Sequence, residues 1–205
     1  MRVGFYLDGD RCTGCKACVM ACKDAHDLPP GLSYRRVYNM VTGTWEEDDG
    51  GTPIPVGVYS YSISMACCHC KEPACVAACP QKAIKKEEDG IVWIDPEACV
   101  GCRLCAKRCP HGAIQFNRSA GVSEKCDLCR RRIKEHKEPE CVAACPMRCL
   151  KLVDLDTFRP PAEGVTIGYP AASVTQPSMR LHLNRRMRPG EDKGPVRISN
   201  MPEEI

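Results

Sequence analysis

The chain has 205 residues, enough for one domain of ordinary size or two small ones. Its three Phe, two Trp and six Tyr would give only a modest organic core, whereas cysteine is unusually frequent, with 18 residues. Lys and Arg (29) nearly balance Asp and Glu (26), so charge gives little support for a nucleic-acid partner. No run of 18 apolar residues occurs, so no membrane-spanning helix is expected, and the N-terminal segment shows no export signal.

The expected elements are short strands between cysteine-rich segments, which indicates the α+β class. Strands are predicted at residues 3–7, 56–65, 83–86, 91–94, 113–117, 122–125 and 150–154. Residues 87–90 and 119–121 are predicted to be hairpin turns. The insertion at 23–66 is otherwise expected to be mostly loop, because it contains several Pro and Gly residues. The tail after 155 has no sustained period, so we expect it to lie extended over a partner subunit, with a flexible tail as the alternative.

Sixteen of the cysteines form four quartets, here called motifs I to IV. They are Cys12, Cys15, Cys18 and Cys22 (I), Cys67, Cys70, Cys75 and Cys79 (II), Cys99, Cys102, Cys105 and Cys109 (III), and Cys126, Cys129, Cys141 and Cys145 (IV). Each quartet begins C-x2-C and ends C-x3-C, the ligand pattern of bacterial two-cluster ferredoxins. In that pattern the fourth ligand of each cluster comes from a partner motif. The sequence therefore predicts four 4Fe–4S clusters and electron transfer, and we find no catalytic constellation in it.

The C-x3-C pair that ends each quartet is predicted to form a helical turn. Pro80, Pro110 and Pro146 follow the last cysteine of motifs II to IV and would end that turn, because proline does not continue a helix. In motif I the corresponding residue is Lys23, and the long insertion follows it.

Other interpretations of the cysteines are weaker. Disulfides need an oxidising compartment and would not require C-x2-C in every motif. A zinc-stabilised interaction module uses four tetrahedral ligands, usually in two separated pairs, and only motif IV has that form. Cys68 and Cys149 are predicted not to be ligands, since Cys149 aligns with Ala83 and Ala113 in the repeat and Cys68 lies inside a C-x2-C loop.

Histidines and net charge are interpreted in the light of these clusters. His69 lies in a cluster loop and His111 follows Cys109-Pro110, so either one is placed to donate a hydrogen bond to a sulfur and raise a potential. Each 4Fe–4S cluster with four thiolates carries roughly −2, so four of them would bring the formal charge from +3 to about −5. Nucleic acid is therefore not expected as a partner.

The sequence resembles the iron–sulfur, electron-transfer subunit of the dimethyl sulfoxide reductase family of molybdopterin oxidoreductases. The resemblance rests on the segments RCTGCKACVMACKD, YRRVY, CHCKEPACVAACP, EDGIVWIDPEACVGCRLCAKRCPHGAIQFN, KCDLC and CVAACP. It implies an α+β fold of two ferredoxin-like modules with interleaved chain. The outer module would comprise 1–60 and 118–155 with an insertion at 23–60, the inner module 61–117, and the tail 156–205 would wrap a partner subunit.

The same resemblance implies which cysteines share a cluster. Carried over residue by residue, the four sets are Cys12, Cys15, Cys18 and Cys145; Cys126, Cys129, Cys141 and Cys22; Cys67, Cys70, Cys75 and Cys109; and Cys99, Cys102, Cys105 and Cys79. One branch of the superfamily has Trp in place of a motif III cysteine and a three-iron cluster. Cys102 is present here, so four irons are expected.

The implied partners are a catalytic subunit with a molybdenum or tungsten bis-pterin cofactor and a quinol-oxidising membrane subunit. Co-export with the catalytic subunit would place the protein in a membrane-associated complex on the outer, periplasmic face. A soluble cytoplasmic complex explains the missing signal equally well. The alternative functions are the cluster subunit of a soluble formate dehydrogenase, hydrogenase or molybdopterin hydroxylase complex and, in a different class, the zinc-stabilised module.

Overall fold

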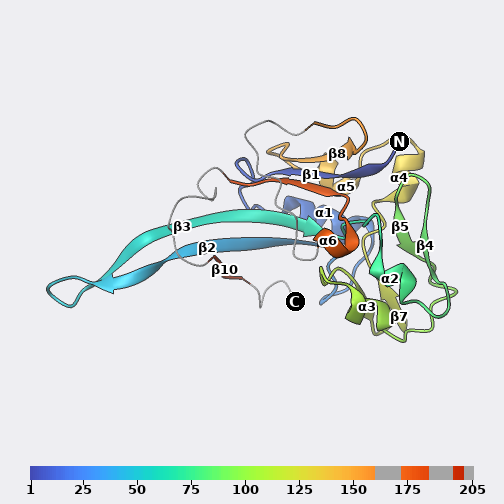
Figure 1. Ribbon diagram of the computed structural model, residues 1–205, viewed down its shortest axis with the longest axis horizontal. Helices are drawn as coiled ribbons and strands as arrows, with labels where there is room; N and C mark the ends of the chain where they lie inside the picture. The colour runs from blue at the N-terminus through green and yellow to red at the C-terminus, as the bar shows by residue number, and fades with distance from the viewer. Residues whose placement is uncertain (160–171, 185–195, 201–205) are drawn as a thin grey trace.

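The computed structural model describes residues 1–159, 172–184 and 196–200. It consists of a body of short helices and small sheets, from which one long two-stranded arm projects (Figure 1). This arrangement belongs to the predicted α+β class. Among the described residues, no helix is long and apolar enough to cross a membrane.

A three-stranded sheet lies along one side of the body. Its central strand is β1 (Val3–Asp8), which pairs antiparallel with β8 (Leu150–Asp154) and parallel with β9 (Met179–His182). Val3, Phe5 and Leu7 of β1 are almost fully buried. The strands predicted at 3–7 and 150–154 are confirmed, and together they join the two ends of the cysteine-rich region.

The arm is formed by β2 (Arg35–Glu47) and β3 (Pro53–Ala66), which pair antiparallel over most of their length. The prediction that the insertion is mostly loop is therefore wrong, although the strand predicted at 56–65 is confirmed. Gly50 and Gly51 lie in the turn, and Gly43 and Gly57 lie at an irregularity in the register, so these residues interrupt the ribbon only locally. The inner half of the arm packs on the body, whereas its outer half projects from it (Figure 1). The predicted module boundary at 60/61 falls inside β3.

Two short hairpins form the far end of the body. They consist of β4 (Ile84–Lys86) with β5 (Val92–Ile94), and β6 (Gln115–Asn117) with β7 (Val122–Glu124). Both hairpins are confirmed at the predicted places.

A helical turn accompanies each C-x3-C pair, as predicted. These turns are α1 (Ala17–Ala25), α2 (Ala74–Ala77), α3 (Leu104–Arg108) and α5 (Glu140–Ala143), and α4 (Arg130–Lys134) follows Cys129. Only α1 continues beyond its last cysteine, because Lys23 stands where the other motifs have proline.

The helices pack in two pairs. α1 lies against α5, which brings motif I to motif IV, and α2 lies against α3, which brings motif II to motif III. A small second core formed by Cys75, Ile84, Val92, Cys105 and Ile114 belongs to the α2–α3 pair. These contacts are compatible with the two-module division at 1–60 with 118–155 and 61–117, which stays a prediction.

The described part of the tail packs on the protein's own body. α6 (Ala172–Thr175) and β9 lie against the body, and β10 (Arg197–Ile198) pairs with β2. Met179, Leu181 and Leu183 alternate along this segment and are buried in the main core. Residues 172–184 therefore pack on the protein's own body, and the wrapping of a partner subunit by the tail 156–205 stays a prediction. Residues 160–171, 185–195 and 201–205 lie outside the described residues.

Candidate metal centres

The third residue of the first C-x2-C loop in each motif has a positive φ. The angles are 71° at Gly14, 42° at His69, 67° at Gly101 and 63° at Leu128. Two of these residues are not glycine, so the loop holds a conformation that ordinary residues rarely adopt. Alternation of left-handed residues with their neighbours turns successive backbone N–H groups toward one side, which makes a concave binding site for an anionic group.

A second repeated turn follows the C-P pairs of motifs II to IV. Lys82, Gly112 and Arg148 have φ of 52°, 58° and 50°, and their amides donate to the carbonyls three residues earlier, at 3.2, 3.3 and 3.1 Å. This turn directs the chain from the last cysteine of each motif into a following strand. In motifs II to IV, the C-x3-C pair therefore lies where a helical turn passes through this second turn into a strand.

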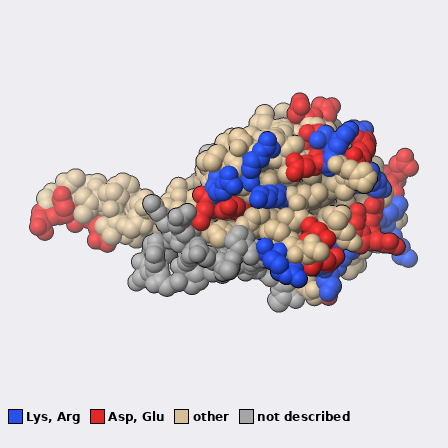
Figure 2. Space-filling view, turned by 90° about the horizontal axis from the view of Figure 1, so that it is seen from above, with Lys and Arg blue, Asp and Glu red and all other residues tan. Residues whose placement is uncertain are grey.

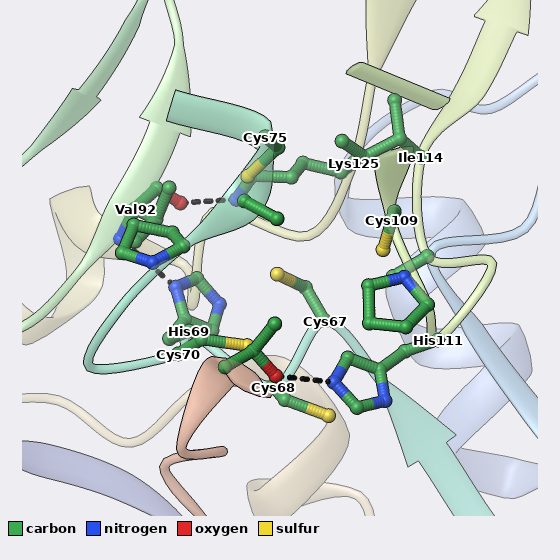
Figure 3. Close-up of a pocket in the computed structure, with 15 residues that line it drawn as sticks. Cys67, Cys68, His69, Cys70, Cys75, Val92, Cys109, His111, Ile114 and Lys125 are labelled. Carbon is green, nitrogen blue, oxygen red and sulfur yellow. Dashed lines mark hydrogen bonds between the residues drawn. The ribbon is translucent and has the colours of Figure 1, made fainter. Parts of the chain in front are cut away.

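Three cavities gather cysteines from two motifs each. The first cavity is lined by Cys12, Cys15, Cys18 and Cys145. The second cavity is lined by Cys67, Cys70, Cys75 and Cys109, and the third by Cys79, Cys99, Cys102 and Cys105. In every case three cysteines come from one motif and the fourth is the last cysteine of another. Figure 3 shows the second cavity, with the sulfurs of Cys67, Cys75 and Cys109 directed toward one another across it.

The remaining four cysteines of the quartets also lie close together. This central thiol group consists of Cys22, Cys126, Cys129 and Cys141. Burial raises the pKa of Cys22 to about 12, and the neighbouring Cys141 adds to this effect. Burial, followed by the nearness of Cys22, likewise raises the pKa of Cys126 well above its usual range. His26 Nε2 lies 3.6 Å from the Cys129 sulfur.

The two extra cysteines lie beside these cavities. Cys149 lines the first cavity, where its sulfur is 3.5 Å from that of Cys145. Its thiol hydrogen-bonds Cys12 and lowers the Cys12 pKa to about 6. Cys68 is buried at the second cavity, but its sulfur approaches the Ala66 carbonyl at 3.9 Å and points away from the other sulfurs (Figure 3). The prediction that neither is a ligand stays a prediction.

Two buried cations lie among the thiols, and sequence reasoning did not identify either. Arg35 is only 1% exposed; its Nη1 donates to Ser64 Oγ at 3.1 Å, and its guanidinium lies 4.4 Å from the centre of the Phe5 ring. Burial opposes its positive charge, but Cys141, then Cys126 and Cys18, outweigh this effect and raise the pKa of Arg35 above its usual range. The available signal was a charged residue on the inward side of an alternating strand, which the assumption of a loop concealed.

Lys125 is the second buried cation, and it borders the second cavity. Its ammonium donates to the Val92 carbonyl and, at 2.9 Å, to the Cys126 carbonyl. It therefore places a positive charge between motif II and motif IV. Both cations would offset the negative charge of bound clusters.

The second cavity is closed by the tail. Thr175 lines it, is 1% exposed, and its hydroxyl lies 3.1 Å from His111 Nε2. The same segment is fixed by backbone hydrogen bonds from Lys71 to Gln176, from Glu72 to Thr175 and from Ser178 to Cys68. No pattern within the tail itself predicts this contact.

Comparison with known proteins agrees with this geometry. Residues 58–155 match the family described as 4Fe-4S dicluster domain, and residues 9–34 match a 4Fe-4S binding domain. A chain of the anaerobic dimethyl sulfoxide reductase of Escherichia coli is 42% identical over 92% of this sequence and 92% of its own length. This protein is a member of the family of dimethyl sulfoxide reductase iron–sulfur subunits. The corresponding chain of the Haemophilus influenzae reductase is 38% identical over 90% of this sequence, and the formate dehydrogenase iron–sulfur subunit of Wolinella succinogenes is 35% identical over 77% of it.

Membership of this family identifies the protein as an iron–sulfur electron-transfer subunit that contains 4Fe–4S binding domains. The residues of the cavities fit such clusters. All 18 cysteines are free, and sixteen of them are grouped in fours. A basic residue lines each of the three cavities: Lys16 the first, Lys125 the second and Arg103 the third. Soft thiolate ligands select iron–sulfur clusters, copper(I) or zinc.

Proposed function

We propose that the protein carries four 4Fe–4S clusters and relays electrons between a quinol-oxidising membrane subunit and a molybdenum or tungsten bis-pterin catalytic subunit. When bound, each cluster would accept and return one electron. The ligands would be the four cysteines of the first, second and third cavities and the four of the central thiol group. The observation that carries the proposal is the repeated pairing of three cysteines from one motif with the last cysteine of another.

The contacts support a linear order for the clusters. The first cavity and the central thiol group share α1 and α5, and the second and third cavities share α2 and α3. Lys125 borders the second cavity and donates to the carbonyl of Cys126, so the central thiol group also adjoins the second cavity. Cys15 and Cys102, one at each end of this series, are exposed. Electrons would therefore enter and leave near these two cysteines.

The assignment can be tested with two cysteines of the same cavity, four residues apart. Cys145→Ser should lose or alter the same cluster as Cys12→Ser, because both would bind it, whereas Cys149→Ser should retain about sixteen irons and sixteen sulfides per chain. Iron and sulfide analysis with electron paramagnetic resonance (EPR) distinguishes the variants. The assignment is wrong if Cys145→Ser leaves the Cys12-dependent cluster intact. Zinc in near-stoichiometric amounts without sulfide would refute the cluster proposal.

The partners are tested by purifying the protein from its own cells. We expect it with a bis-pterin catalytic subunit and a membrane subunit, in a complex that faces the periplasm. The similarity to a formate dehydrogenase subunit favours a second candidate, a soluble complex with a related catalytic subunit. Co-purification without any membrane subunit would favour that candidate, and quinol-dependent reduction of the clusters would favour the first.

A further inference from the structure

His69 is locked in one tautomer by a backbone hydrogen bond. Its imidazole is 1% exposed, and the Val92 N–H donates to Nδ1 at 3.0 Å (Figure 3). A nitrogen that accepts a hydrogen bond carries no proton, and a neutral imidazole must carry one on its other nitrogen. The proton of His69 therefore resides on Nε2.

The Nε2–H group of His69 is a buried donor without an acceptor among the described residues. Such a group costs free energy unless something accepts its hydrogen bond. His69 lines the second cavity with Cys67, Cys70, Cys75 and Cys109. Those are the thiols to which we assigned a cluster, and the sulfur atoms of a cluster accept hydrogen bonds.

The surroundings hold the imidazole in place. The Val92 carbonyl accepts from the buried Lys125, so the peptide groups on both sides of Val92 are engaged. At His69 itself, φ of 42° places the ring at the left-handed position of its C-x2-C loop. The donor is therefore oriented before any cluster binds.

We propose that His69 donates an Nε2–H hydrogen bond to the cluster of the second cavity and raises the reduction potential of that cluster alone. This inference rests on the proposed function, since it needs a cluster between these four cysteines. A donor stabilises the more negative, reduced state, so it raises the potential. His69 is a positioning and tuning residue. His111 lines the same cavity, but its Nε2 is engaged with the Thr175 hydroxyl.

Two substitutions distinguish the roles of the two ring nitrogens of His69. His69→Asn places an acceptor near Nδ1 for the Val92 amide, tolerates a positive φ, and removes the donor at Nε2. His69→Gln places an amide donor near Nε2 and removes the Nδ1 acceptor. In EPR-monitored redox titrations of the complete protein, we expect His69→Asn to lower one of the four midpoint potentials by about 59 mV, a tenfold change for a one-electron couple. His69→Gln should stay near the wild-type value.

His111→Asn serves as the matched control in the same cavity and should leave all four midpoint potentials near their wild-type values. Equal shifts in His69→Asn and His69→Gln, no shift in His69→Asn, or the same shift in His111→Asn would overturn the inference.

Pulsed EPR of protein labelled with 15N-histidine tests the hydrogen bond directly, and its first measurement is on the wild type. We expect a weak coupling between a histidine nitrogen and the cluster in the wild type, retained in His111→Asn and lost in His69→Asn. A wild-type cluster without such coupling would refute the role of His69 but leave the proposed function standing. Iron and sulfide below four clusters, with no signal that depends on Cys70, would instead refute the proposed function.

Discussion

Arg35 shows how much of the site depends on one residue in a segment without cysteines. Its Nε and Nη2 are buried donors with no acceptor among the described residues, and its Nη1 meets Ser64, whose hydroxyl is 3.3 Å from the Cys18 sulfur. An unpaired buried charge is costly, and anionic clusters nearby would compensate it. Arg35 is thus placed to stabilise the clusters that we propose for the first cavity and the central thiol group.

We expect Arg35→Met to lower the potentials of the clusters bound in the first cavity and in the central thiol group. A unit charge at roughly 8 Å and an effective dielectric constant of about 20 changes the energy of an added electron by roughly 2 kcal/mol. Arg35→Lys should keep part of the effect, because it keeps the charge. Redox titration followed by EPR measures both variants.

The matched control is Arg36→Met, one residue along β2. The Arg36 guanidinium hydrogen-bonds the Tyr38 hydroxyl at 3.4 Å and the Gly112 carbonyl at 3.3 Å, away from the first cavity. Arg36→Met should leave the potentials of the clusters in the first cavity and the central thiol group nearly unchanged. Equal changes in the two Met variants would show that Arg35 has no special role.

At the scale of elements, the short strands and helical turns were predictable because their signals are local. Proline after the cysteine, alternation over a few residues and Gly-containing turns lie within each segment, as at Pro80 and Gly90. β2 was missed because its Pro and Gly neighbours were assigned to loop, although Arg35 and Val37 alternate inward with the half-buried Arg36 and Tyr38. The docking of β9 and the partner of His69 depend on residues more than twenty positions away, and no local pattern contains that information.

The pairing of β9 with β1 requires a glycine at position 4. A Cβ atom at Gly4 would lie 2.0 Å from the Ser178 carbonyl oxygen and 2.8 Å from a Leu155 methyl group. Backbone cannot yield by that much, so we expect Gly4→Ala to displace β9 and destabilise the protein by about 1–3 kcal/mol. Thermal unfolding and limited proteolysis of the tail measure the two effects.

Gly50→Ala is the control for that experiment. Gly50 lies in the exposed turn of the arm, whose tip carries the acidic residues 46–49 (Figure 2), and its nearest neighbour is a side-chain oxygen of Asp48 at 3.3 Å. The unfolding temperature of Gly50→Ala should stay close to that of the wild type. A tail that remains resistant to protease in Gly4→Ala would contradict the requirement for close approach.

At the scale of the whole molecule, the helix pairs and the tail connect distant parts of the chain to one another. Motif I meets motif IV through α1 and α5, and the tail reaches both the first sheet through β9 and the second cavity through Thr175. The sequence motifs predicted the first connection through the family resemblance. They did not predict the second, because the tail carries no cysteine.

Two truncations test this role of the tail. Ending the chain after residue 171 removes α6 and β9, which uncovers Cys70 in the second cavity and strips a neighbour from β1. We expect that variant to unfold at a lower temperature and to lose the cluster of the second cavity first on exposure to air, because solvent and oxygen reach it. Ending the chain after residue 184 keeps α6 and β9 and should retain that cluster at the wild-type rate. EPR and iron content followed over time in air compare the two. Equal rates of cluster loss would show that the tail does not protect the second cavity, and that its burial of Thr175 serves only the stability of the fold.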